Sequence, residues 1–363
     1  MGSGTYTIAN NLTIGDGTNA GATGATNNPD VNVGGALTVA ANGTLTTGTG
    51  TITLSGTSTP LVVNGTFTAS TSGTVNYTGD GASTVLATSY YNLGLKPGGA
   101  SNQVLGSGTF TINNDLTIGN GTNAGVSASA NNPTINLLGN LTIGTNATYT
   151  KGSGTTTFKK GGTQTLTDST SSKQDLGIIR ISSNSTNTTV NMGSSIKVTN
   201  VTIDASQTLD AVGATTLTVL GNWTDNGSLT ARTGTVTFNG TGTQTIAGSS
   251  TFYNLSITTT SARTVQFTAG TTQSVASGGS INFTGAANNL LTLASTSSGN
   301  AWNLQANNGI ASQTLQYLDV SDSNAGPAGT YAQLNADDAT SHDSGNNTNW
   351  NFGATGNGFF VFF

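Results

Sequence analysis

The sequence predicts an all-β parallel β-helix, an elongated solenoid without substantial helix. Three observations lead to this prediction. Short apolar runs alternate with Thr or Asn and are separated by Gly, Ser and Asn, a pattern typical of short strands joined by tight turns. Similar units follow one another at roughly twenty residues, which is the length of one solenoid coil with two or three strands. Glu, a strong helix former, does not occur, since all 14 acidic residues are Asp.

The clearest repeating unit is the segment 234–257. Its strands alternate apolar residues such as Val236 and Phe238 with Thr, and it ends in Tyr-Asn-Leu-Ser-Ile. Echoes of this unit lie at 154–166, with Gly-Thr-Gln-Thr-Leu, and at 73–95, which ends in Tyr-Asn-Leu-Gly-Leu. Repetition at this scale favours one stacked array over several separate domains.

A longer duplication covers residues 6–158 at an ungapped offset of 104 residues, so that Tyr6 matches Phe110 and Leu12 matches Leu116. A third, weaker copy begins near Leu220-Gly221-Asn222-Trp223, which echoes Leu138-Gly139-Asn140-Leu141. The chain is therefore divided into a lead (1–5), a solenoid array (6–352) with superrepeats at about 6–109, 110–219 and 220–352, and an apolar tail (353–363).

Long inserts within the first two superrepeats, at 16–30 and 120–134, are expected to bulge from the corners of the solenoid. An array of antiparallel sandwiches is the alternative fold. It would use two-residue hairpins at Asn-Gly dipeptides, which the sequence contains at Asn42-Gly43, Asn64-Gly65 and Asn226-Gly227. The twenty-residue repetition favours the solenoid.

The composition excludes several classes of function. Charged residues make up 6% of the chain and the net charge is −5, so the scattered Lys and Arg cannot neutralise a nucleic-acid backbone. Without cysteine, the chain has neither disulfides nor thiolate metal sites. No apolar run is long enough for a membrane-spanning helix, and the start Met1-Gly2-Ser3-Gly4 does not resemble a signal peptide. An export signal is expected to have been removed or to lie outside this sequence.

The repeat motifs resemble those of right-handed parallel β-helix proteins on bacterial cell surfaces, in particular filamentous-haemagglutinin-like and autotransporter-passenger adhesins. The resemblance covers residues 6–352 and rests on the Tyr-Asn-Leu endings, the Gly-Thr-Val-Thr-Phe-Asn-Gly and Gln-Thr-Ile segments, and the closing motif at 343–350. It implies an extracellular, non-catalytic structural or adhesive segment of a surface protein, or a subunit of an extracellular fibre. Its implied partners are other copies, neighbouring domains, glycans or a host surface. Such proteins also carry a translocator or anchor domain, which we do not recognise among these residues.

A carbohydrate-binding or carbohydrate-active β-helix protein is the first alternative. Polysaccharide cleavage requires carboxylates that converge in one groove. The nearest mixed cluster consists of Asp175, Lys173 and Arg180, and the only histidine, His342, lies in an Asp-rich loop. These signals are weak, so we predict that the chain is not an enzyme. A less favoured alternative is an ice-binding solenoid, because Thr-x-Thr tracts such as Thr235 and Thr237 recur.

Two groups near the C-terminus are candidate functional residues. Five Asp residues lie within twenty-five positions and could bind Ca²⁺, which prefers several oxygen ligands in a flexible loop; they are Asp319, Asp322, Asp337, Asp338 and Asp343. No other cofactor is predicted. The second group is the apolar tail, whose high β-propensity and lack of charge predict a cap or an assembly strand; it comprises Phe359, Phe360, Val361, Phe362 and Phe363. A cut domain boundary would explain the tail equally well.

Overall fold

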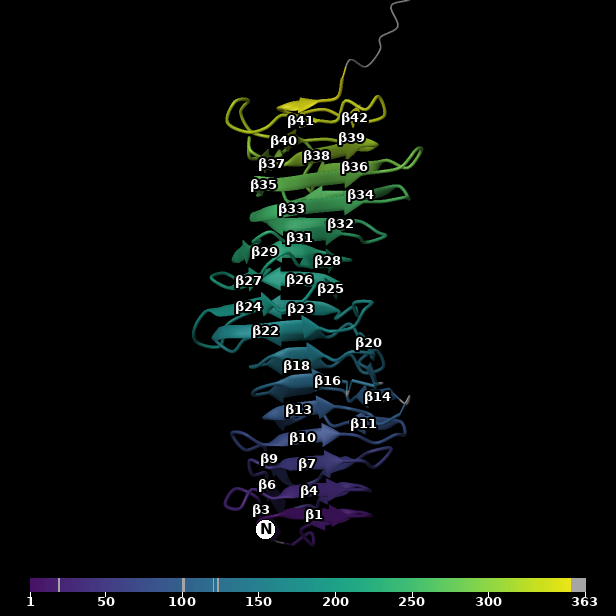
Figure 1. Ribbon diagram of the computed structural model, residues 1–363, viewed down its shortest axis with the longest axis vertical. Coiled ribbons are helices and arrows are strands. Elements are labelled where there is room, and N and C mark those ends of the chain that lie inside the picture. Colours follow the sequence, from purple (N-terminus) through teal and green to yellow (C-terminus); the bar gives the residue numbers. More distant parts are fainter. Residues whose placement is uncertain (19, 100–101, 120, 123, 354–363) are drawn as a thin grey trace, which may run out of the picture. The chain divides into compact units, whose positions relative to one another are not determined.

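The computed structural model describes residues 1–18, 20–99, 102–119, 121–122 and 124–353. Over these residues the fold is all-β, with short strands, tight turns and no helix. The chain forms two compact units, Met1–Ile196 and Lys197–Phe363. In each unit the strands of successive turns pair in parallel as a β-solenoid, and the units together contain about 14 turns (Figure 1). The prediction of an all-β parallel solenoid is confirmed.

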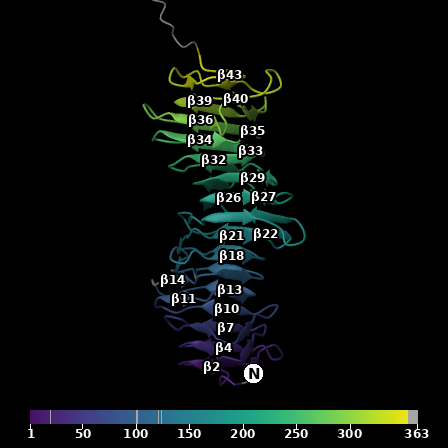
Figure 2. The same cartoon turned by 180° about the vertical axis from the view of Figure 1, so that it is seen from behind.

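One sheet, here called the long sheet, continues from the first turn of the first unit to its last. Every strand in it pairs in parallel with the strand one turn later, and both views in Figures 1 and 2 show β4, β7, β10 and β13 in this succession. Its strands in this unit are β1 (Thr5–Ile8), β4 (Asp30–Val33), β7 (Thr51–Leu54), β10 (Thr74–Tyr77), β13 (Asn92–Leu95), β16 (Leu116–Ile118), β19 (Leu141–Ile143), β22 (Gly162–Asp168) and β24 (Thr188–Met192).

Shorter parallel sheets complete the turns of the first unit. Their strands are β2 (Leu12–Ile14), β5 (Leu37–Val39) and β8 (Leu61–Val63); β3 (Ala20–Thr23), β6 (Gly43–Thr46) and β9 (Thr66–Thr68); β11 (Ser83–Val85), β14 (Asn102–Leu105), β17 (Ala124–Ser127) and β20 (Ala147–Thr150); and β12 (Ser89–Tyr90), β15 (Thr109–Ile112), β18 (Thr134–Leu137), β21 (Thr155–Phe158) and β23 (Ile178–Ile181).

The second unit repeats this arrangement. Strand β25 (Ile196–Val198) lies at the boundary between the units. The parallel sheets are β28 (Thr216–Val219), β31 (Thr235–Phe238), β33 (Ser250–Thr258), β35 (Thr272–Thr284), β37 (Trp302–Ala306) and β40 (Ser323–Asn324), with β38 (Ser312–Gln316) beside β35; β26 (Asn200–Ile203), β29 (Trp223–Asp225), β32 (Gln244–Gly248), β34 (Arg263–Phe267), β36 (Leu291–Ser295), β39 (Leu318–Val320) and β42 (His342–Asp343); β27 (Thr208–Asp210) and β30 (Ser228–Thr230); and β41 (Leu334–Asn335) and β43 (Trp350–Asn351).

The core consists of columns of inward apolar side chains. Each strand alternates buried and outward residues, so the parallel register places apolar residues of successive turns on one another. In the long sheet, Val31 stands opposite Ile52, Ile52 opposite Val75 and Val75 opposite Leu93, and all four are at most 5% exposed. In the second unit the rings of Phe267 and Trp302 stack with centroids 3.8 Å apart.

The sequence-repeat unit is also a structural unit. Thr235 of β31 pairs with Asn254 of β33 in the next turn, and Thr74 of β10 pairs with Asn92 of β13 in the same way. In both copies the Asn amide donates to the Thr hydroxyl of the previous turn, at 3.3 Å from Asn254 and 3.2 Å from Asn92. The Tyr-Asn-Leu ending therefore marks the strand that stacks on the preceding Thr-rich strand.

The two inserts differ from the prediction. Each contains a strand that pairs in parallel with a later turn, β3 with β6 and β17 with β20. The insert residues therefore complete the turn of the solenoid. The strand in the first insert reads Ala-Gly-Ala-Thr, and such a strand gives no apolar alternation that could be recognised in the sequence.

The 104-residue duplication does not correspond to a whole number of turns. Strand β1 belongs to the long sheet, whereas its sequence copy β15 pairs with β12 and β18 in another sheet. Similarly, β2 pairs with β5 outside the long sheet, whereas its copy β16 is a long-sheet strand. The same apolar alternation is therefore used on different faces of the solenoid.

Two buried glutamines join one turn to the turn before it. Gln164 Nε2 donates to the carbonyl oxygens of Leu137 (3.1 Å) and Gly139, and its Oε1 accepts from the Lys160 N–H at 3.0 Å. The neighbouring Thr165 N–H donates to Asn140 Oδ1 at 2.7 Å. We call this set of contacts the glutamine clasp.

A second glutamine clasp occurs in the other unit. Gln244 Nε2 donates to the carbonyl oxygens of Val219 (3.2 Å) and Gly221 (2.5 Å), and the Thr245 N–H donates to Asn222 Oδ1 at 2.9 Å. The Leu-Gly-Asn motif and the Gly-Thr-Gln-Thr motif both recur in the sequence. In each copy the two motifs contact each other through the glutamine clasp.

We predict that Gln164→Ala lowers the free energy of unfolding by about 2–3 kcal/mol, because it leaves buried backbone groups without partners. Gln333→Ala, at an exposed position, should change it by less than about 0.5 kcal/mol. Urea unfolding followed by circular dichroism measures both. Equal effects of the two substitutions would contradict a structural role of the clasp.

Candidate functional site

The five predicted calcium ligands lie in the last turns of the second unit, where most of their carboxylates accept hydrogen bonds. Asp338 is the clearest case. Its Oδ2 accepts from the Tyr317 N–H at 2.8 Å and from the Thr340 hydroxyl, and its Oδ1 accepts from the N–H groups of Thr340 (3.0 Å) and Ser341 (2.8 Å). Burial raises the pKa of Asp338, but these hydrogen bonds outweigh it and lower the pKa to about 2. This carboxylate fixes a turn.

The other four Asp residues have separate surroundings. Asp322 is buried, and its Oδ1 accepts from Asn346 Nδ2 at 2.9 Å and from the Gly299 N–H at 3.2 Å. Asp343 Oδ1 accepts from the Gly345 N–H at 2.9 Å and from Asn347 Nδ2 at 2.6 Å. Asp319 accepts from the Ser344 hydroxyl and stands opposite the exposed His342, while Asp337 is exposed.

Over the residues that the structure describes, no three acidic, histidine or cysteine side chains lie close enough to hold a metal ion together. Calcium can also use backbone and amide oxygens, so the calcium site stays a prediction. The predicted assembly residues Phe359, Phe360, Val361, Phe362 and Phe363 lie outside the described residues.

Two residues of the mixed cluster make contacts outside it. Asp175 makes an ion pair with Lys151, whereas the Lys173 ammonium donates to the carbonyl oxygens of Asp168 (2.6 Å) and Thr170 (2.8 Å). Asp168 itself is fully buried and accepts from the Thr170 and Gln174 N–H groups at 2.9 and 2.6 Å. These contacts hold the loop after β22 in place.

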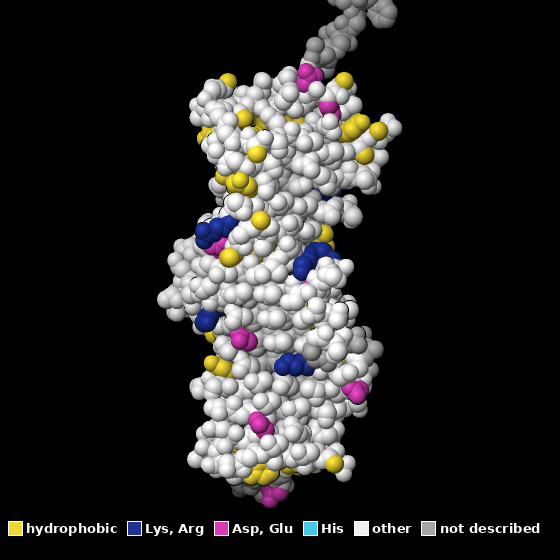
Figure 3. All heavy atoms as spheres, in the orientation of Figure 1, with side chains coloured by type: hydrophobic (Ala, Val, Ile, Leu, Met, Phe, Trp, Pro, Cys, Tyr) yellow, Lys and Arg dark blue, Asp and Glu magenta, His cyan; other side chains and the backbone are white. Residues whose placement is uncertain are grey.

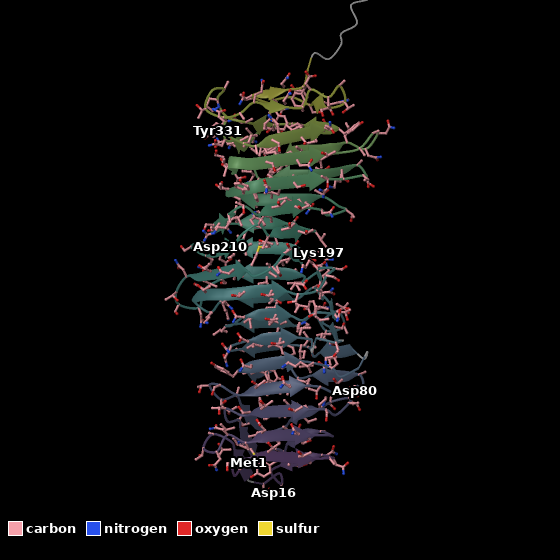
Figure 4. All side chains as sticks on the ribbon, in the orientation of Figure 1. Met1, Asp16, Asp80, Lys197, Asp210 and Tyr331 are labelled. Carbon is pink, nitrogen blue, oxygen red and sulfur yellow. The ribbon has the colours of Figure 1, made fainter. Side chains whose placement is uncertain are left out.

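Two further carboxylates of the second unit have structural partners. Asp210, labelled in Figure 4, accepts from Nε and Nη2 of Arg232 at 3.0 and 2.7 Å, and this pairing lowers its pKa. Asp225 accepts from the Ser250 hydroxyl at 2.7 Å, and the same hydroxyl accepts from Trp223 Nε1 at 2.9 Å. Burial raises the pKa of Asp225 despite these hydrogen bonds.

Outward Thr residues form columns on more than one sheet. Thr51 stands opposite Thr74 in the long sheet, and Thr109 stands opposite Thr134 between β15 and β18. The long-sheet column continues into Asn92, so it is not pure Thr. A dedicated ice-binding face would carry regular Thr columns on one face. Because Thr is also favoured as a general outward strand residue, the ice-binding alternative stays a prediction.

A polar depression of the first unit is a groove on the outer side of the long sheet, here called the Gly94 groove. Its volume is about 240 Å³, and it lies across β10, β13 and β16. It is lined by Thr74, Asn76, Asn92, Leu93, Gly94, Lys96, Asn114, Asp115 and Thr117. Parallel pairing brings these residues together from three turns, because Asn76 stands opposite Gly94 and Gly94 opposite Thr117.

Gly94 lies at the floor of this groove and is itself buried, because neighbouring side chains cover it. A Cβ placed on Gly94 would lie 2.0 Å from Asn76 Oδ1 and 3.1 Å from Lys96 Cε, so both neighbouring side chains lean over this position. Asn76 Oδ1 is buried and accepts no hydrogen bond from a described residue. The repeat in the second unit has Ser256 at the corresponding position. The groove was not predicted from the sequence, although glycine at an outward strand position is a signal for it.

We predict that acid weakens the fold partly through Asp338. Since its pKa is lower in the folded chain than its ordinary value of 3.8, its stabilisation is present above pH 3.8 and is lost as the pH falls through about 2. The effect should be about 1 kcal/mol, allowing for solvent screening. Unfolding midpoints between pH 6 and pH 2 should therefore fall less steeply in Asp338→Asn than in the wild type. Asp80→Asn, at an exposed position, is the control. Parallel curves for wild type and Asp338→Asn would refute the assignment.

The calcium prediction has its own test. If the Asp segment binds Ca²⁺, chelation should lower the melting temperature, because a bound ion stabilises the folded state. Asp337→Asn combined with Asp338→Asn should abolish that dependence. A melting temperature that chelation leaves unchanged would show that these carboxylates serve only as hydrogen-bond acceptors.

Over the described residues, the structure has no helix that is long and apolar enough to cross a membrane. Comparison of the chain with protein-family models, with curated proteins and with solved structures finds no match. The fold is therefore established by the structure itself, and the adhesin resemblance rests on the repeat motifs of the sequence.

Proposed function

We propose that this chain is a non-catalytic structural or adhesive segment of a bacterial cell-surface protein, or a subunit of an extracellular fibre. It would act outside the cell, where the stacked turns would serve as a spacer or would present a binding surface. The observation that carries this proposal is the uniform exterior of the coils. Outward positions of successive strands carry Thr, Asn and Ser in columns, as in Thr216 opposite Thr235 and Thr237 opposite Ser256.

The distribution of charge supports the same role. On the face that Figure 3 shows, charged side chains are few, and most of them are surrounded by uncharged surface. Several carboxylates already accept hydrogen bonds that stabilise the local backbone, such as those of Asp168, Asp210 and Asp338. A catalytic pair would instead require carboxylates aimed at one substrate position. Uncharged hydroxyls and amides suit a surface that must stay hydrated without attracting ions.

A carbohydrate-binding role is the second candidate, and the Gly94 groove is the observation that favours it. Several amide and hydroxyl groups converge there beside Lys96 and Asp115. Carbohydrate binding is compatible with adhesion, because glycans cover the surfaces to which an adhesive segment would attach.

The role can be tested by coating beads with the full chain and measuring their retention on cells and on immobilised polysaccharides. We expect retention above that of uncoated beads, without release of new reducing ends from the polysaccharides and without inhibition of ice recrystallisation. Polysaccharide turnover that a single Asp substitution abolishes would overturn the proposal in favour of an enzyme. Inhibition of ice recrystallisation would favour the ice-binding alternative.

A further inference from the structure

We propose that the Gly94 groove binds one uncharged saccharide unit of a glycan. This inference rests on the adhesive role proposed above and assigns a ligand class and a position to it. The groove volume of about 240 Å³ is smaller than the roughly 300–1,000 Å³ of pockets for drug-sized ligands. One sugar ring, or a short segment of a glycan lying along the sheet, is a ligand of suitable size.

The lining offers donors and acceptors that are not used by the fold. The Lys96 ammonium donates to no other described residue and has no ion-pair partner among them. Asp115 uses Oδ1 for Asn140, at 2.8 Å from the backbone N–H and 3.0 Å from Nδ2. Its Oδ2 makes no contact with a described residue and can accept from a ligand hydroxyl. Vicinal sugar hydroxyls both donate and accept, so they match such a mixed lining.

Other lining side chains are held in fixed orientations. Asn92 Nδ2 donates to Thr74 Oγ1 at 3.2 Å, and Asn92 Oδ1 accepts from Asn114 Nδ2 at 2.8 Å and from the Asp115 N–H at 3.2 Å. This chain of hydrogen bonds connects three successive turns across the groove. The polar wall is therefore preorganised, which reduces the entropy lost on binding.

Asn76 Oδ1 accepts no hydrogen bond from a described residue, so the groove should favour a ligand that carries a hydroxyl donor. Buried amide oxygens are rarely left without a hydrogen bond, and a ligand O–H over Gly94 would supply the missing donor. The hydroxyl can reach this oxygen when Lys96, whose Cε lies beside Gly94, swings aside. Lys96 can then donate to a neighbouring oxygen of the same sugar.

Other ligand classes fit less well. A phosphate or sulfate group would meet a single cation, Lys96, with Asp115 in the same lining. A hard metal ion would find one carboxylate, that of Asp115, and its Oδ1 already accepts two hydrogen bonds from Asn140. An apolar ligand would find little apolar surface, since Leu93, the one apolar side chain of the lining, is only 1% exposed.

A wider depression in the same unit, about 620 Å³, is lined by residues 57–59, 81–84 and 104. It offers hydroxyls, small side chains and a valine, without an amide or a charged side chain. Its hydroxyls can donate and accept, but it lacks the amide and charged groups that line the Gly94 groove.

The test uses the full chain with a glycan array and with glucose, galactose and mannose in ligand-observed NMR. We expect wild type to bind uncharged glycans with a Kd of about 1 mM, since few hydrogen bonds and no aromatic platform contribute. Asn76→Ala should weaken binding by about three- to tenfold, the effect of one hydrogen bond. Gly94→Ser, which copies Ser256 of the second unit, places a Cβ where Asn76 Oδ1 lies, so it should displace this oxygen and abolish binding. Both variants should retain the wild-type unfolding midpoint.

Two controls separate the groove from the rest of the surface. Asn32→Ala changes the same outward column two turns earlier, outside the groove, and should leave glycan binding unchanged. Lys159→Ala removes a lysine from elsewhere in the first unit and should also have no effect, whereas Lys96→Ala should weaken binding.

Glycan binding that persists in Asn76→Ala and Gly94→Ser would overturn the groove assignment. Binding of anionic glycans alone, or no binding by wild type at 50 mM sugar, would overturn the ligand class. If coated beads are still retained in these cases, the adhesive role survives and only this inference fails. If bead retention is lost in Gly94→Ser but not in Asn32→Ala, the groove is the adhesive site.

Discussion

The hydrogen-bonded register between successive turns is the constraint on which the rest of this structure depends. Within a strand, side chains alternate between the core and the exterior, so a shift of one residue would exchange the two sets. The parallel pairing of Val31, Ile52, Val75 and Leu93 keeps every turn in phase. The same register also aligns the outward residues, which places Thr and Asn side chains of neighbouring turns within hydrogen-bonding distance.

The sequence predicts the alternation well but not the face on which each strand lies. Period-two patterns distinguish inward from outward residues, and the short runs bounded by Gly, Ser and Asn do correspond to strands. The face depends on how many residues each corner contains. Strands β1 and β15 share their pattern yet lie in different sheets, and β3 forms from Ala-Gly-Ala-Thr because β6 offers a partner. These features arise from pairing between turns and are not visible in any single segment.

Polar residues at inward positions show the same limit. The run Gly-Thr-Gln-Thr-Leu alternates as though Gln164 were apolar, and Gln164 is indeed buried. Its partners Leu137 and Gly139 are carbonyl groups one turn earlier in the chain. The Asp-rich segment shows that the reverse also holds, because Asp338 and Asp343 are near in sequence but accept hydrogen bonds from different groups, the N–H of Ser341 and the N–H of Gly345. Clustering in the sequence therefore does not imply that carboxylates converge.

The Gly94 groove lies where the first unit differs from the corresponding repeat of the second unit at one position. In the second unit Thr237, Ser256 and Asn282 stand in register on the outer face, and each position carries a side chain. The equivalent series in the first unit is Asn76, Gly94 and Thr117, with its middle side chain missing. Because paired strands lie at a constant spacing, the repeat also fixes the positions of the neighbouring polar side chains. With no side chain at Gly94, Asn76 Oδ1 and Lys96 Cε lie over this position, so one glycine in the column lets the neighbouring side chains shape the surface.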